Sequence, residues 1–273
     1  MLRESLFINS LLVNADVWTN LTKKEINQLT IVDNAMVRAI WECPSYTSVP
    51  VMFLDLGIKP IKFYIIQRRV MFYHYLLNQD EDSLLFKCFF AQCQEPLPGD
   101  WILQVKEDFK ILNLKLSDQE IKQQSKASFH KFIKSQVDTF AFEYLMEEKK
   151  KQSKCSSIPY NTLKMQDYVL SNDITSIQKK ILLQMRTATY PVYANIKFLV
   201  DDILCPCCFS HDDTMSHQIE CPVINNNIIS VSKNAVSLDQ IFSQDVGKQI
   251  EITRIFDEAT KRRKIIVNKK KPK

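Results

Sequence analysis

The sequence predicts a mainly α protein, with a multi-helix, bundle-like region, a small zinc-bound CCHC module and a basic C-terminal helix and tail. Three observations support this fold class. Apolar residues recur at helical spacing along most of the 273 residues, 45% of the residues are hydrophobic, and only three are glycine. So few glycines favour helices over tight hairpins, and this apolar content is enough to bury a core.

The expected helices follow from their start and stop signals. Thr22 to Glu25 has the form of a capping box, and apolar residues follow at steps of three or four as far as Ile40. A short helix is expected over 50–56, because Gly57 suits a helix C-terminus, and a longer, mostly buried helix is expected over 60–78. Further helices are predicted at 83–94, 101–112, 117–152 with a break near Ser125 to Ser128, 161–171, 175–188 and 245–264.

Composition divides the chain into four predicted segments. A helical region over 1–95 ends at EPLPGD, residues 95–100, which contains two prolines and a glycine. A helical connector over 96–195, a metal module over 196–230, and an amphipathic helix with a basic tail over 231–273 follow. Because no apolar run approaches the roughly 18 residues that span a bilayer, we expect no membrane association.

The stretch CPCCFSHDDTMSHQIEC, residues 205–221, contains four of the eight cysteines and two of the four histidines. Cys205, Cys208, His217 and Cys221 have the spacing C-x2-C-x8-H-x3-C, which suits a tetrahedral Zn²⁺ site. A C-x-x-C turn presents both sulfurs to one point, and positions i and i+4 of a helix share a face. The sequence therefore predicts Zn²⁺ as the cofactor.

Several alternatives to this ligand set stay open. Cys207 could replace a neighbouring cysteine, and His211 could compete with His217. The thiols could also cluster without a metal. A disulfide is less favoured, because the opening residues MLRESLF lack the pattern of a secretory signal peptide. We accordingly expect an intracellular protein, nuclear and cytoplasmic.

Positive charge is unevenly distributed in this chain of net charge +5. The pair Arg68–Arg69 is expected at the surface of the helix over 60–78, where it is predicted to bind nucleic acid. The C-terminal basic residues are Lys261, Arg262, Arg263, Lys264, Lys269, Lys270, Lys271 and Lys273. Beside a zinc module they indicate a phosphate-binding arm, and the alternative is a solvated helix end or a disordered tail.

Three stretches in order carry a resemblance to a known family. LLVNADVWTNLTKKEINQLTIVDNAMVRAI, LDLGIKPIKFYIIQRRVMFYHYLL and the cysteine–histidine cluster resemble the C-terminal third of reverse transcriptases from non-LTR (LINE-type) retrotransposons. Smaller matches, such as GDWILQVKEDF and DDTMSHQIECPVI, fill the intervals. The resemblance implies a thumb-like region over 1–95 that holds template and primer, and a knuckle that grips RNA or target DNA. Cys207 departs from the family pattern, in which that position is not cysteine.

Polymerase chemistry is not expected from this chain. Reverse transcription needs palm carboxylates that hold two Mg²⁺ ions. The one candidate pair, Asp201 and Asp202 in FLVDDIL, lies just ahead of Cys205 in a helical context. We therefore predict no catalytic residues, and a chain that is not an enzyme on its own because it lacks the palm and the endonuclease.

The predicted function is that of a zinc-containing nucleic-acid-binding C-terminal fragment of such a reverse transcriptase. It would position template RNA and target DNA, with RNA, DNA and the remainder of the retrotransposon polyprotein as partners. Two alternatives remain. One is a zinc-dependent protein-interaction adaptor, and the other is a decayed element fragment without a selected function.

Overall fold

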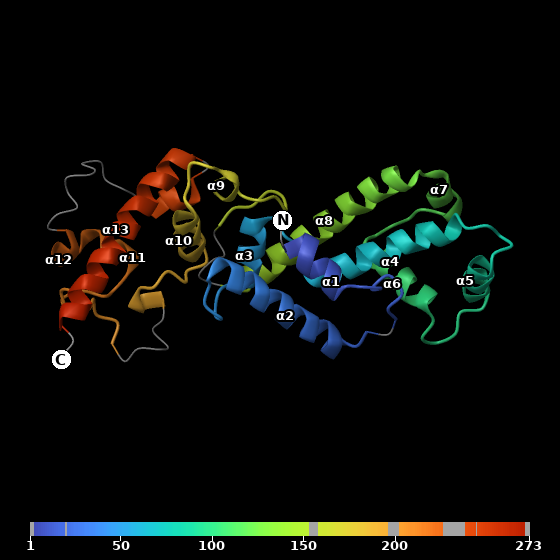
Figure 1. Cartoon of the computed structure of the whole chain (residues 1–273), viewed down its shortest axis with the longest axis horizontal. Helices are drawn as coiled ribbons and strands as arrows, with labels where there is room; N and C mark the ends of the chain where they lie inside the picture. The colour runs from blue at the N-terminus through green and yellow to red at the C-terminus, as the bar shows by residue number, and fades with distance from the viewer. Residues whose placement is uncertain are drawn as a thin grey trace. The chain divides into compact units, whose positions relative to one another are not determined.

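The computed structural model describes residues 3–19, 21–152, 158–195, 202–225, 238–243 and 245–270, and its description excludes the side chains of 239–240 and 268–270. Within these ranges the chain is mainly helical, as Figure 1 shows. The described residues contain no β-strand, only one isolated antiparallel bridge between Leu204 and Asp212. The predicted mainly α fold is confirmed.

The chain divides into two compact units, each built from two separate stretches. The first unit comprises Met1–Val37 and Lys59–Met146, and the second comprises Arg38–Ile58 and Glu147–Lys273. The EPLPGD segment connects two helices of the first unit, so the predicted segment boundary at residue 95 lies inside that unit.

Helices make up nearly all the regular structure of both units. The first unit contains the π-helix η1 (Arg3–Ile8), α1 (Asn9–Leu11), most of α2 (Lys23–Trp41), α4 (Ile61–Leu77), α5 (Leu84–Gln94), α6 (Trp101–Ile111), α7 (Asp118–Gln123) and most of α8 (Lys126–Lys150). The second contains α3 (Val49–Leu56), α9 (Asp167–Leu170), α10 (Ser176–Arg186), η3 (Tyr193–Asn195), α11 (Met215–Glu220), α12 (Pro222–Asn225), η4 (Leu238–Phe242) and α13 (Val246–Lys270).

Local signals set most of the helix boundaries. At the start of α2, the Glu25 N–H donates to Thr22 Oγ1 at 3.2 Å, and the Thr22 N–H donates to Glu25 Oε2 at 2.7 Å. This is the predicted capping box. Gly57 ends α3 in the left-handed region, with φ of 61°. The predicted long helix over 117–152 is interrupted between α7 and α8, as expected, because α7 ends at Gln123 and α8 begins at Lys126.

Two expected helices differ from the structure. Over 161–171 only the four residues of α9 are helical, because the preceding chain packs against the end of α3. There the Gln166 N–H donates to the Asp55 carbonyl at 2.9 Å, and a Cβ on Gly57 would lie 2.2 Å from the Met165 nitrogen. In the other case α13 is longer than predicted, since it continues past residue 264 to Lys270.

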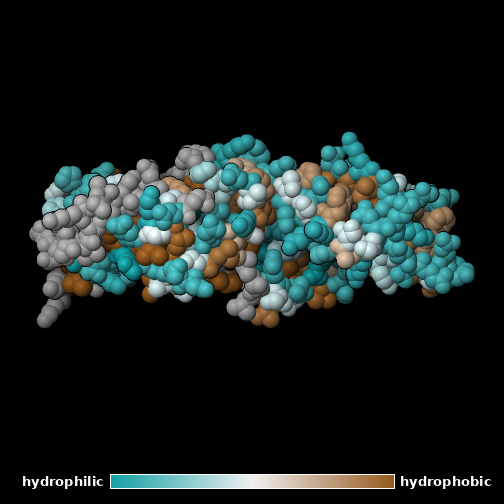
Figure 2. All heavy atoms as spheres, turned by 90° about the horizontal axis from the view of Figure 1, so that it is seen from above, coloured by the Kyte–Doolittle hydropathy of each residue, from teal (hydrophilic) through white to brown (hydrophobic). Residues whose placement is uncertain are grey.

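Each unit has its own apolar core. In the first, Ile8 and Leu12 pack against Ile61 and Ile65 of α4. In the second, helices α10 and α13 meet around Leu182, Tyr190 and Phe256. Hydrophilic residues cover most of the face seen in Figure 2, with apolar patches between them. Among the described helices, none combines the length and apolar character that a membrane span requires.

Candidate metal centre

A short turn positions the first two cysteines of the cluster. The Cys205 N–H donates to the His211 carbonyl at 2.8 Å, and the Phe209 N–H donates to the Cys205 carbonyl at 2.9 Å. These two hydrogen bonds enclose a backbone turn at residues 206–208. The sulfurs of Cys205 and Cys208 can therefore face the same point, which is the property that the C-x-x-C spacing predicts.

Helix α11 positions the other two side chains. Thr214 caps its N-terminus by accepting the His217 N–H at 3.0 Å. The helix ends at Glu220 and is capped by Cys221, whose N–H donates to the His217 carbonyl at 2.6 Å. This i→i+4 bond holds His217 and Cys221 one turn apart, so both side chains point to the same side of the helix.

The four side chains converge at one point. The ligand atoms of Cys205, Cys208, His217 and Cys221 all lie within 4.8 Å of one another. The sulfurs of Cys205 and Cys221 are 3.9 Å apart, and Cys208 Sγ lies 3.2 Å from His217 Nε2.

These distances fit a tetrahedral site. Bond lengths typical of zinc, about 2.3 Å to sulfur and about 2.0 Å to nitrogen, require sulfur–sulfur separations of about 3.8 Å. A disulfide would need about 2.05 Å. Among the described residues, this is the one group of three or more Cys, His, Asp or Glu side chains close enough to hold a metal ion.

Neither alternative ligand, Cys207 or His211, belongs to the converging group. Cys207 is buried and packs with Ile224 and Ala259 around the cluster, but its sulfur is outside the converging set. His211 stacks on His217 with ring centroids 5.2 Å apart, and it too is outside the set. Cys207 is thus a core residue of the knuckle, and His211 is a neighbour of a ligand.

The thiols differ in acidity when no metal is bound. Burial raises the pKa of Cys207 to about 12 and that of Cys221 to about 11. Burial opposes ionisation of Cys208 as well, but hydrogen bonds from the Ser210 N–H and from His217 lower its pKa to about 6. Cys208 is therefore a thiolate at neutral pH, the form that binds metals.

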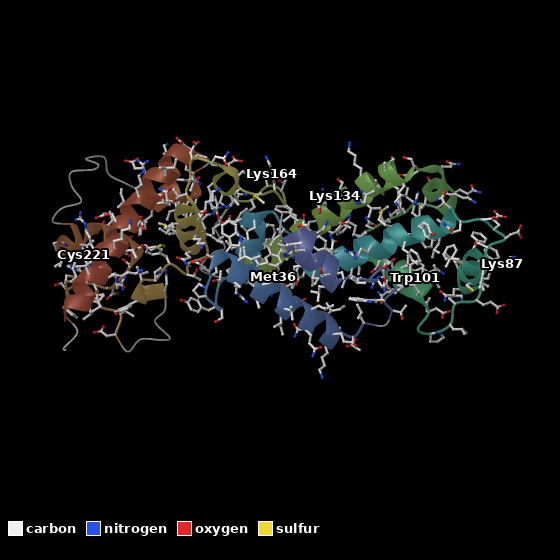
Figure 3. The ribbon with its side chains drawn as sticks, in the orientation of Figure 1. Met36, Lys87, Trp101, Lys134, Lys164 and Cys221 are labelled. Carbon is white, nitrogen blue, oxygen red and sulfur yellow. The ribbon has the colours of Figure 1, made fainter. Side chains whose placement is uncertain are left out.

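Helix α13 covers the knuckle formed by residues 205–221. Ala259, Ile266 and Val267 pack against the cysteines and Ile224. In Figure 3, the labelled Cys221 lies beside this helix. Arg263 of the same helix donates to Asp213 in the knuckle and to the Pro191 carbonyl at 3.1 Å. An apolar surface and a buried ion pair therefore hold the knuckle together with α13.

Two predicted nucleic-acid-binding residues have structural positions instead. The expectation that Arg69 lies at the surface is wrong, because it is 5% exposed and its guanidinium donates twice to Asp108, at 2.6 and 2.8 Å. Arg263 is likewise buried, on Asp213. A buried arginine needs a carboxylate partner, and these two already have one. Arg68 is half-buried and donates to the Leu12 carbonyl and to Asn9 Oδ1.

The other predicted cations of α13 with described side chains lie at least partly at the surface. Lys261 and Lys264 are exposed and Arg262 is half-buried. Lys261 pairs with Asp257 and Arg262 with Glu258 one turn earlier, and exposed pairs of this kind contribute little stability. Lys269 and Lys270 belong to the helix, but their side chains lie outside the described residues, as does all of Lys271.

The remaining candidate carboxylates do not extend the site. Asp202 accepts the Leu204 N–H at 2.9 Å, whereas Asp201 lies outside the described residues. Sequence reasoning missed Asp213, which accepts the Tyr193 N–H at 2.7 Å as well as the guanidinium of Arg263. Its position between the two ligand pairs was the only available signal.

Comparison with protein-family models, with curated proteins and with solved structures finds no match. The structure itself therefore defines the class. This is a mainly helical protein with a three-cysteine, one-histidine cluster that could hold a metal ion.

Proposed function

We propose that this chain is a zinc-containing nucleic-acid-binding protein, related to the C-terminal region of non-LTR retrotransposon reverse transcriptases. It would bind RNA and DNA mainly through their phosphates, as a partner of the remaining polyprotein, in the nucleus and cytoplasm. Zn²⁺ is the proposed metal because three thiolates and one imidazole are its usual ligands. Four protein ligands leave no open position for a substrate, so the metal's role is structural rather than catalytic.

The charge of α13 carries the proposal. This helix contains eight lysines and arginines against three acidic residues, an excess of +5, which equals the net charge of the whole chain. One face covers the metal ligands, while Lys261 and Lys264 are exposed to solvent. A concentrated positive surface attracts the phosphate backbone, because each neutralised phosphate releases counterions.

The test is a salt titration of nucleic-acid binding by the zinc-loaded full chain. Fluorescence anisotropy would measure its affinity for labelled single-stranded RNA, single-stranded DNA and duplex DNA. Lys261→Gln with Lys264→Gln should weaken binding to all three. It should also reduce the slope of log affinity against log salt by about 1.8 on duplex, at about 0.9 for each contact.

The matched control removes the same charge elsewhere. Lys87 and Lys110 are exposed side chains of the first unit, 59% and 72% accessible. Their double change to Gln should leave the slope close to that of the unmodified chain. If the metal-loaded chain binds none of the three nucleic acids, the proposal fails and the protein-interaction adaptor becomes the better hypothesis.

A further inference from the structure

The first unit contains an open groove of about 750 Å³ between η1, α1, α4 and α8. All its lining residues belong to that unit. The volume falls within the roughly 300–1,000 Å³ that ligand sites usually have. The groove shares no residue with the candidate metal centre, whose residues belong to the second unit.

One face of α4 forms an aromatic wall of the groove. Tyr64, Phe72 and Tyr75 line it, at positions i, i+8 and i+11 of the helix. The rings of Phe72 and Tyr75 are stacked, with centroids 5.7 Å apart and planes inclined by 18°. Tyr75 is 47% exposed, which leaves part of its ring available to a ligand. Such a ring can stack on any unpaired base, because every base has a π-face.

Helix α8 forms a basic wall of the same groove. Lys126, His130 and Lys134 line it at positions i, i+4 and i+8, so they share one side of the helix. All three are exposed, and Figure 3 labels Lys134 on this helix. Within the described residues, neither lysine forms an ion pair or a side-chain hydrogen bond. Both ammonium groups are therefore available to an anion.

Four further charged residues line the groove, which are Glu4, Asp16, Lys59 and Arg68. Lys59 pairs with Asp138 at 2.8 Å, and Glu4 accepts the Tyr64 hydroxyl at 2.6 Å. Asp16 is a second lining carboxylate, and the guanidinium of Arg68 donates to the Leu12 carbonyl and to Asn9 Oδ1. The free positive charge thus concentrates on the α8 wall, while the stacking surface lies on the α4 wall.

We propose that this groove binds a single strand of RNA or DNA, with phosphates along Lys126 and Lys134 and an unpaired base stacked on the exposed ring of Tyr75, which Phe72 supports from its other side. Lysines beside exposed aromatic rings form the arrangement by which single strands are held without sequence preference. A duplex keeps its bases stacked inside and offers none to the rings. The inference rests on the proposed function and deepens it, because it assigns the unpaired strand to the first unit.

The experiment compares matched variants of the zinc-loaded full chain. Affinities would be measured for a labelled single strand of about 12 nucleotides, within the range of about 4–16 that such sites cover, and for the corresponding duplex. Tyr75→Leu should weaken single-strand binding about tenfold, the effect of losing one stacked base. Phe90→Leu is the control, since Phe90 is a similarly exposed ring, 50% accessible, outside the groove.

The basic wall has its own matched pair. Lys134→Gln should weaken single-strand binding and reduce the salt slope by about 0.7. Lys131→Gln should do neither, because Lys131 is exposed on the same helix but does not line the groove.

Tyr75→Phe keeps the ring and should retain the original affinity, which separates loss of stacking from loss of folding.

Three outcomes decide the matter. Selective loss of single-strand binding in the groove variants supports the proposal. If these variants match their controls while Lys261→Gln with Lys264→Gln still weakens binding, the groove is overturned and the function assigned to α13 stands. If the unmodified chain binds no nucleic acid, both proposals fail. Photocrosslinking with a thiouridine-containing strand adds a direct readout, since crosslinks confined to the second unit would also overturn the groove.

Discussion

Arg263 of α13 donates to the buried carboxylate of Asp213, at a distance of 2.5 Å, in the segment between the two pairs of candidate metal ligands. The Asp213 side chain is 1% exposed, and burial raises its pKa although the Tyr193 N–H and Arg263 favour the charged form. The last helix of the described chain is therefore tied directly to the knuckle. Arg263, which the sequence suggested as a phosphate-binding residue, therefore has a structural role.

Arg263→Met should consequently loosen the knuckle. Removing one partner leaves the other charge buried and unpaired, which typically costs about 3–5 kcal/mol. We expect faster zinc loss to a chelator and faster hydrogen exchange over residues 211–221. Lys264→Met removes an exposed neighbouring charge and should change neither rate. Equal zinc-loss rates in the two variants would mean that the ion pair does not hold the knuckle.

The ligand set makes adjacent cysteines behave differently. Cys208→Ser should abolish most zinc binding, because Cys208 belongs to the converging group. Cys207→Ser should keep about one zinc per chain, since its sulfur lies outside that group. Zinc stoichiometry, and the visible spectrum of the cobalt-substituted protein, would report both. Retention of metal by Cys208→Ser together with its loss from Cys207→Ser would exchange the two assignments.

Zinc binding should weaken as the pH falls. The pKa of Cys221 is raised to about 11 without metal, so zinc must displace its proton at any pH near neutrality. The pKa of Cys208 is lowered to about 6, so this thiolate begins to take up a proton only near and below that pH. The dependence of log affinity on pH should therefore steepen by about one proton below pH 6. Competition with a chelator at a series of pH values would measure it, and an affinity independent of pH would contradict it.

Arg69 should be essential for folding of the first unit. Arg69→Met leaves the carboxylate of Asp108, 0% exposed, without its partner, at a cost of about 3–5 kcal/mol. The double variant Arg69→Met with Asp108→Leu should recover most of this loss, because an apolar pair can replace a buried ion pair. Urea unfolding of both variants tests this. If the free energy of unfolding of the double variant is as low as that of Arg69→Met, this apolar pair cannot replace the ion pair.

The ion pairs also indicate why part of the site could not be predicted. Thr22 and Glu25 at a capping box, or His217 and Cys221 one turn apart, are close in sequence, so their spacing predicts their contact. Arg69 and Asp108, or Asp213 and Arg263, are brought together only by folding. A sequence pattern cannot distinguish such a buried arginine from one that binds phosphate.

The region after residue 160 was difficult to predict for the same reason, because it packs against a segment that is distant in the sequence. Its apolar pattern suggested a helix over 161–171, but the chain before α9 follows the end of α3 instead. The helix α3 was predicted because Gly57 supplies a local stop signal, and in the structure a capping box at Thr175 begins α10, where a helix over 175–188 was predicted. The mainly α class and the converging cysteines and histidine were predictable because their signals lie close together in the sequence.

Gly57 should tolerate no side chain. Its φ of 61° disfavours other residues, and a Cβ would lie 2.2 Å from the Met165 nitrogen and 2.7 Å from the Lys164 carbonyl carbon. Because these contacts are with backbone, Gly57→Ala should destabilise the second unit by several kcal/mol, on the order of 3. Gly247→Ala is the control, where the nearest contact is the Asp245 side chain at 3.1 Å. Equal melting temperatures for the two variants would be the contrary result.

The covering of the knuckle by α13 has a consequence for how the protein is made. All four candidate metal-binding side chains lie within residues 205–221, whereas α13 begins only at Val246. On the ribosome the complete ligand set therefore emerges before the helix that covers it. We expect the nascent chain to bind metal at that stage, before α13 packs onto the knuckle. A shortage of metal during translation would then leave α13 without a folded surface to pack against.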